Sequence, residues 1–82
     1  MKMNNEVNGN KMKLLRKRCA EYNRVIHTQN LYLRANGESI RLINGHVAGD
    51  SIAFESLNTG KTILVTDFEN LYNGRGERVT VD

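Results

Sequence analysis

Apolar and polar residues alternate between residues 31 and 66, whose sequence is LYLRANGESIRLINGHVAGDSIAFESLNTGKTILVT. A period of two is typical of β-strands that bury one face and expose the other. Turn sequences interrupt the alternation at Asn36-Gly37 and Asn58-Thr59-Gly60, and glycine supplies the positive φ that tight hairpins require. The pattern therefore predicts antiparallel strands joined by short hairpins, with positive φ at Gly60 and a strand that begins at Thr62.

The pair Asn44-Gly45 lies between two apolar stretches and has two interpretations. It is either another turn or a β-bulge at which one long strand bends. Ala48-Gly49-Asp50 marks the following turn, and Asn73-Gly74-Arg75-Gly76 marks a later one. A short last strand is expected after that turn, at residues 78–81.

Residues 11–26 follow a different period. Apolar residues recur there at spacings of three and four, which at about 100° per residue places them on one side of an amphipathic helix. Leu14 projects away from this stripe, and Asn8 or Asn10 is placed to cap the start of the helix. The residues of the stripe are Met12, Leu15, Cys19, Tyr22 and Ile26.

Residues 1–9 are polar, rich in asparagine and without periodicity. Such a segment buries nothing that offsets the entropy lost on ordering, so we expect a mobile polar tail. A chain of 82 residues supports one compact core. Residues 10–82 are therefore expected to form a single α+β domain.

A helix followed by four or five short strands must bury one helix stripe and one sheet face. We expect an N-terminal amphipathic helix packed on a strongly bent antiparallel sheet that is similar to a small barrel. The helix is followed by LYLRANG, IRLINGHVAGD, IAFESL, NTG and KTILVTDF, and over roughly residues 11–72 this order resembles the Sm-like and SH3-like small-barrel class. The sequence lacks the Asp and Met-Asn-Leu signature of the Sm family, so no binding residue is carried over from the resemblance.

Positive charge is concentrated in one segment. Residues 11–24 contain six basic residues and one acidic residue, a net charge of +5, whereas residues 25–82 contain five basic and seven acidic residues, a net charge of −2. A charged side opposite an apolar stripe is common on surface helices, but such sides usually mix both signs. Because grouped cations release counterions when they bind phosphates, the segment favours a polyanionic partner.

The first functional hypothesis is a small non-catalytic module that binds RNA or a ribonucleoprotein. Tyr32 and Tyr72 are further candidates, as platforms on which single-stranded bases stack. The second hypothesis is a stoichiometric protein inhibitor or adaptor of the phage or mobile-element type, whose basic surface docks on an acidic host protein. The residues expected to bind are Lys13, Arg16, Lys17 and Arg24 of the helix, with Arg75 and Arg78 of the last turn.

No motif indicates an enzyme. Gly60-Lys61-Thr62 resembles the end of a phosphate-binding loop, but Glu55 stands where that loop needs glycine, and a β-rich run follows instead of a helix. Asp67 with Glu69, and Asp50 with Glu55, are expected at solvated strand ends rather than in a pocket that separates their pKa values. We therefore expect neither catalysis nor a cofactor.

Cys19, His27 and His46 do not match the spacing of zinc ligands, so no metal site is expected. Cys19 lies on the apolar stripe and is expected to be a core residue. One cysteine cannot form an internal disulfide, which agrees with a reducing compartment. The chain shows neither a signal peptide nor an apolar run long enough to span a membrane, so a cytoplasmic protein without membrane contact is expected.

Overall fold

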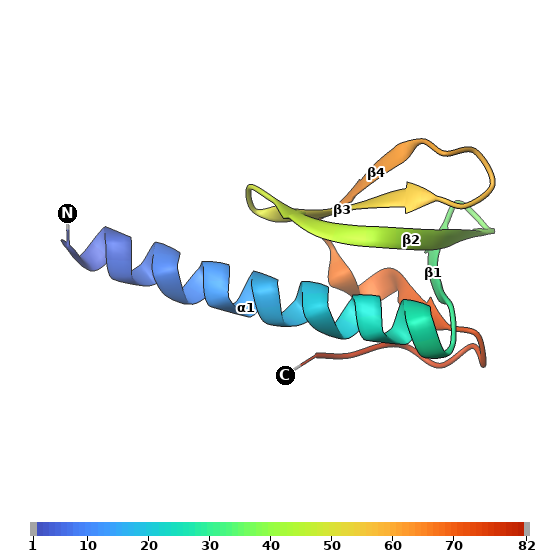
Figure 1. Ribbon diagram of the computed structural model, residues 1–82, viewed down its shortest axis with the longest axis horizontal. Coiled ribbons are helices and arrows are strands. Elements are labelled where there is room, and N and C mark those ends of the chain that lie inside the picture. The colour runs from blue at the N-terminus through green and yellow to red at the C-terminus, as the bar shows by residue number, and fades with distance from the viewer. Residues whose placement is uncertain (1, 82) are drawn as a thin grey trace.

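The computed structural model of the protein describes the backbone of residues 2–81 and the side chains of residues 11–81. A long N-terminal helix packs on an antiparallel sheet of five strands, which confirms the predicted α+β fold (Figure 1). The strands are ordered β4-β3-β2-β1-β5. The elements are α1 (Lys2–Thr28), β1 (Leu31–Ala35), β2 (Glu38–Ala48), β3 (Ser51–Ser56), β4 (Thr62–Val65), the 3-10 helix η1 (Phe68–Asn70) and β5 (Leu71–Asn73).

The predicted hairpins are present. Asn36 and Gly37 join β1 to β2 with φ values of 54° and 77°, so both central residues have the positive φ of a primed turn. Gly60 has a φ of 73° and β4 begins at Thr62, as predicted. At Asn44-Gly45 the bulge interpretation is correct, because β2 continues through this pair while its register with β3 shifts.

The predicted last strand at residues 78–81 is wrong. Only an isolated bridge forms there, between Tyr72 and Arg78, supported by a 2.8 Å hydrogen bond from the Val79 amide to the Leu71 carbonyl. Since β5 is only three residues long, the returning segment has nothing further to pair with. Within the described residues the sheet stays open between β4 and β5, so the resemblance to a barrel is loose.

One core lies between α1 and the sheet. Leu15, Cys19 and Tyr22 of the predicted stripe are buried, and Ile26 is partly buried against the core. Met12 is 37% exposed, which corrects its assignment to the core, because the N-terminal part of α1 extends beyond the sheet (Figure 1). The other buried apolar residues of this cluster are Val25, Leu31, Leu42, Ile52, Phe54, Val65 and Leu71.

Val25 was missed because a single stripe underestimates how far α1 is enclosed. Strand β2 covers one side of the helix, and the segment that ends the chain runs along another side (Figure 1). Val79 and Val81 of that segment pack against the core. The buried arc of α1 is therefore wider than the three-and-four spacing indicates.

The bulge is held to the helix by Asn23. The Asn23 side-chain amide donates a 2.8 Å hydrogen bond to the Gly45 carbonyl, and its oxygen accepts a 2.9 Å hydrogen bond from the Gly45 amide. A Cβ at residue 45 would lie 2.7 Å from the buried Phe54 ring of β3 and 3.3 Å from the Asn23 side-chain oxygen, so the close packing at the bulge requires glycine. This pair fixes how β2 lies on α1.

Helix α1 begins at Lys2, so the predicted start near Asn8 or Asn10 is wrong. Lysine, methionine and glutamate favour helix, and extending a helix that is already nucleated is easier than starting one. The mobility of residues 1–9 stays a prediction, and Met1 and the side chains of residues 2–10 lie outside the described part. No helix within that part is both long and apolar enough to cross a membrane.

Candidate nucleic-acid interface

The four predicted cationic residues of α1 are on its surface. Lys13, Arg16, Lys17 and Arg24 are all exposed, on the part of the helix turned away from buried Leu15. Their spacing places Lys13, Lys17 and Arg24 within one narrow strip, with Arg16 at its margin. We call these four residues the basic helix face.

One acidic residue lies beside the basic helix face. The Arg24 guanidinium donates hydrogen bonds to the Glu21 carboxylate, one of them 2.9 Å long from Nε. This hydrogen bond lowers the pKa of Glu21, and the charges of Arg24 and Lys17 lower it further. The same pairing raises the pKa of Arg24. Arg24 is therefore partly neutralised by Glu21.

Arg75 and Arg78 do not join the basic helix face. Arg75 is exposed in the loop Gly74-Arg75-Gly76, which lies against the C-terminal end of α1. A Cβ at residue 74 would lie 2.5 Å from the Gln29 carbonyl oxygen, so the loop can approach the helix end this closely only with glycine. The six predicted binding residues thus lie in three separate places: the basic helix face, the loop that contains Arg75, and the surroundings of Arg78.

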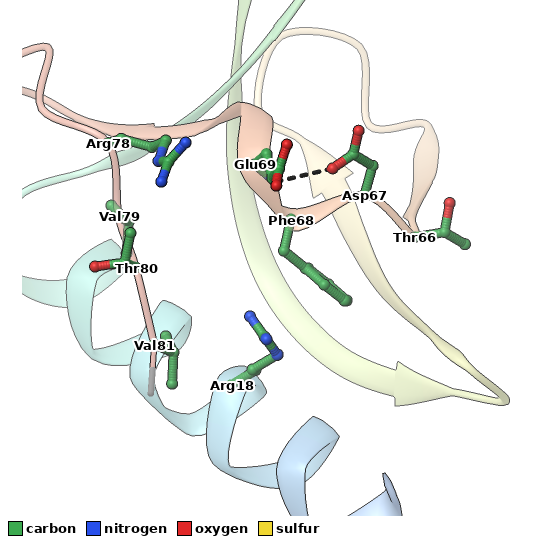
Figure 2. Close-up of a pocket in the computed structure, with 9 residues that line it drawn as sticks. All are labelled: Arg18, Thr66, Asp67, Phe68, Glu69, Arg78, Val79, Thr80 and Val81. Atoms are coloured by element: carbon green, nitrogen blue, oxygen red, sulfur yellow. Dashed lines mark hydrogen bonds between the residues drawn. The ribbon is translucent and has the colours of Figure 1, made fainter.

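Arg78 lines a hollow of about 290 Å³ between α1, η1 and the end of the chain (Figure 2). Arg18 enters this hollow from α1, with its guanidinium carbon 5.0 Å from the centre of the Phe68 ring. Asp67 and Glu69 line it as well, and Asp67 caps η1 by accepting a 3.0 Å hydrogen bond from the Glu69 amide. With two cations and two carboxylates, the hollow has no net preference for an anion.

Tyr22 lies beneath this hollow against Phe68, with the ring centroids 6.0 Å apart and nearly parallel. Its hydroxyl is buried without a hydrogen bond of good geometry. Burial raises the pKa of the Tyr22 phenol, and the nearby Arg18 guanidinium partly offsets this.

A second hollow, of about 200 Å³, lies on the other face of the sheet. Tyr32 of β1 and Tyr72 of β5 are direct partners across the two strands, and both are half-buried. The guanidinium carbon of Arg34 lies 4.1 Å from the centre of the Tyr72 ring. The hollow is lined by Tyr32, Arg34, Ser39, Tyr72, Asn73, Gly74 and Gly76.

Strand alternation explains why these side chains meet. Leu31, Leu33 and Leu71 point to the core, so Tyr32 and Tyr72 point to the opposite face of the sheet, away from α1. Both tyrosines were predicted as stacking candidates, but Arg34 was missed. The signal was present, because Arg34 follows Tyr32 by two residues and so shares its face.

The residues set aside as non-catalytic have ordinary surroundings. Cys19 is buried, as predicted, and burial raises the pKa of its thiol. His27 and His46 are exposed. Among residues 11–81, no group of three His, Cys, Asp or Glu side chains is placed to hold a metal ion.

Comparison of the chain with family models, with curated proteins and with solved structures found no significant match. The resemblance to the Sm-like and SH3-like small-barrel class thus stays a prediction from the order of the elements.

Proposed function

We propose that the chain is a small, non-catalytic module that binds RNA or a ribonucleoprotein through the basic helix face. The observation that supports this is the folding of the +5 segment into a helix on whose surface Lys13, Arg16, Lys17 and Arg24 are all exposed. Cations grouped in this way bind phosphates by releasing counterions, without a sequence motif.

The shape of α1 suits an elongated polyanion. From Lys13 to Arg24 the helix rises by about 16 Å, which is long enough for several phosphates of one strand. All four side chains of the basic helix face are exposed, so a nucleic-acid strand can approach this side of α1. Lys11 is not one of these four residues, and its amine forms a 3.8 Å ion pair with the Asp50 carboxylate.

A mobility-shift assay with purified RNA at about physiological salt tests the proposal. Nonspecific contacts of this kind have dissociation constants of about 10⁻⁴ to 10⁻⁶ M, and we expect binding in that range. The triple variant Lys13→Glu, Lys17→Glu, Arg24→Glu should lose binding and keep its helical circular dichroism, because all three side chains are exposed.

Single reversals provide the matched control. Lys17→Glu and Lys61→Glu change the net charge equally, but Lys61 is exposed in the β3–β4 hairpin rather than on α1. Weaker binding for the first variant alone supports the basic helix face. Equal losses would show that only the total charge matters and would contradict the proposed surface.

The alternative, an inhibitor or adaptor that docks on an acidic protein, is favoured by one observation. Met12 and Leu14 are 37% and 41% exposed beside the basic helix face, and apolar residues next to cations suit a protein partner. No RNA shift, together with recovery of one host protein that resists nuclease and is lost in Leu14→Asp, would replace RNA with a protein as the partner.

A further inference from the structure

We infer that the hollow between Tyr32, Arg34 and Tyr72 binds a nucleobase of single-stranded RNA. The inference rests on the proposed function, because it takes RNA to be the partner. It adds a second contact site, on the face of the sheet opposite α1, which recognises bases rather than phosphates.

The aromatic groups are arranged for stacking. Tyr32 and Tyr72 are directly opposite each other on neighbouring antiparallel strands, and such pairs bring their side chains close together. The guanidinium carbon of Arg34 lies over the Tyr72 ring, 4.1 Å from its centre, where the planar guanidinium can extend the platform. Bases stack on tyrosine rings and on guanidinium planes alike.

The charge and polarity of the hollow suit a nucleotide. Its lining includes one cation and no carboxylate, in contrast to the hollow beside Phe68. Ser39 supplies a hydroxyl that can bond the edge of a base, and Arg75 lies in the adjoining loop within the same turn. A phosphate next to a stacked base could approach the Arg34 guanidinium.

The loop that closes the hollow is already ordered. The Asn73 side-chain oxygen accepts hydrogen bonds from the amides of Arg75 and Glu77, at 2.9 and 3.0 Å. The Gly76 amide donates a further bond to the Asn73 carbonyl at 3.1 Å. A preformed site loses less entropy on binding than a mobile one. Glu77 is not among the residues that line the hollow, and its carboxylate accepts a 3.3 Å hydrogen bond from the Asn73 side-chain amide.

Single strands are the class of nucleic acid that this geometry selects. In a duplex the base faces are stacked on one another, so the rings of Tyr32 and Tyr72 cannot reach them. Stacking tolerates any base because every base has a π-face, so we expect little sequence preference.

Two oligonucleotides of equal length and charge separate this site from the basic helix face. One is a short uridine oligomer, and the other has the same sugar-phosphate backbone without bases. The chain contains no tryptophan, so tyrosine fluorescence reports stacking directly. We expect the uridine oligomer to quench that fluorescence and to bind about tenfold more tightly than the abasic one.

Tyr32→Thr should remove most of this tenfold preference, whereas Tyr32→Phe, which keeps the ring, should retain it. Threonine favours strands, and melting curves show whether the variant folds. Arg34→Ala changes an exposed side chain and provides a second test, with an expected loss of about two- to fivefold for the uridine oligomer alone.

Each outcome bears on a different proposal. If both oligomers bind equally and with the same salt dependence, the basic helix face stands and the stacking site is wrong. If Arg34→Ala and Tyr32→Thr weaken both oligomers equally, the two residues do not recognise bases. If neither oligomer binds at low salt, RNA is not the partner and both proposals fail.

Discussion

Helix α1 has two sides of opposite character along the same few turns. Toward the sheet it places Leu15, Cys19, Tyr22 and Val25 in the core, and away from the sheet it places lysine and arginine in water. Burial of an apolar side chain is worth about 1.5–3 kcal/mol, whereas an exposed charge contributes little to folding. We call the side of α1 in the core its inner side and the side in water its outer side. Substitutions on the inner side should therefore change stability, and substitutions on the outer side should change binding alone.

The largest contrast is between two neighbouring leucines. Leu15 is 5% exposed and Leu14 is 41% exposed. Leu15→Asp buries an unpaired carboxylate, at a cost of several kcal/mol, which is a large part of a typical stability of about 5–15 kcal/mol. Leu14→Asp should change stability by less than about 1 kcal/mol. Equal melting temperatures for the two variants would contradict the register of α1.

A smaller effect is expected where the sheet meets the inner side of α1. Gly45→Ala places a Cβ 2.7 Å from the fully buried Phe54 ring and 3.3 Å from the Asn23 side-chain oxygen. The ring has no free space to move into, so the variant should be destabilised by about 1–3 kcal/mol, measured by urea unfolding. Unchanged stability would mean that the bulge does not hold β2 closely against the helix.

The smallest effect on the inner side concerns the Tyr22 hydroxyl, which is buried without a well-formed hydrogen bond. Because a buried unsatisfied group opposes folding, Tyr22→Phe should leave stability unchanged or raise it by about 1 kcal/mol. Burial raises the pKa of the phenol above its ordinary value near 10, so the unfolded chain ionises first as pH rises.

The raised pKa of Tyr22 determines how the stability of the fold depends on pH. The contribution of Tyr22 ionisation to the free energy of unfolding is fully present below about pH 10 and is lost at higher pH. Urea midpoints at pH 9 and pH 11 should therefore fall less in Tyr22→Phe than in the unchanged chain. An equal fall in both would show that Tyr22 ionises as easily in the folded protein as in the unfolded one.

The inner side of α1 shows what the sequence could and could not reveal. Leu15, Cys19 and Tyr22 followed from their spacing, because the sheet covers the helix along that line. The exposure of Met12 and the burial of Val25 could not be predicted from the spacing, because they depend on where the sheet stops and where the chain end returns. Both features belong to the tertiary structure, and the local sequence does not indicate them.

The hairpins were predictable for the opposite reason. Asn36, Gly37 and Gly60 adopt positive φ, and this local requirement can be predicted directly from the residue types at a turn. The absence of a strand at residues 78–81 could not be predicted, since the length of such a strand depends on how far its partner β5 extends.

The candidate sites divide in the same way. The basic helix face follows from periodicity, whereas the separation of Arg75 and Arg78 from it does not. The contact between Arg34 and Tyr72 depends on β5 pairing with β1, which lies far from it in the sequence. Only the placement of Arg34 on the same face as Tyr32 could be predicted from the local sequence.

The most direct measurement for the outer side of α1 is the salt dependence of RNA binding. Each phosphate neutralised on a single strand contributes about −0.7 to the slope of log K against log salt. Four contacts predict a slope of about −3, and Lys13→Gln, Arg16→Gln or Lys17→Gln should each reduce its magnitude by about 0.7 with no change in melting temperature. Lys61→Gln should leave the slope unchanged. A slope near zero, or the same slope for all four variants and the unchanged chain, would contradict RNA binding through this side of the helix.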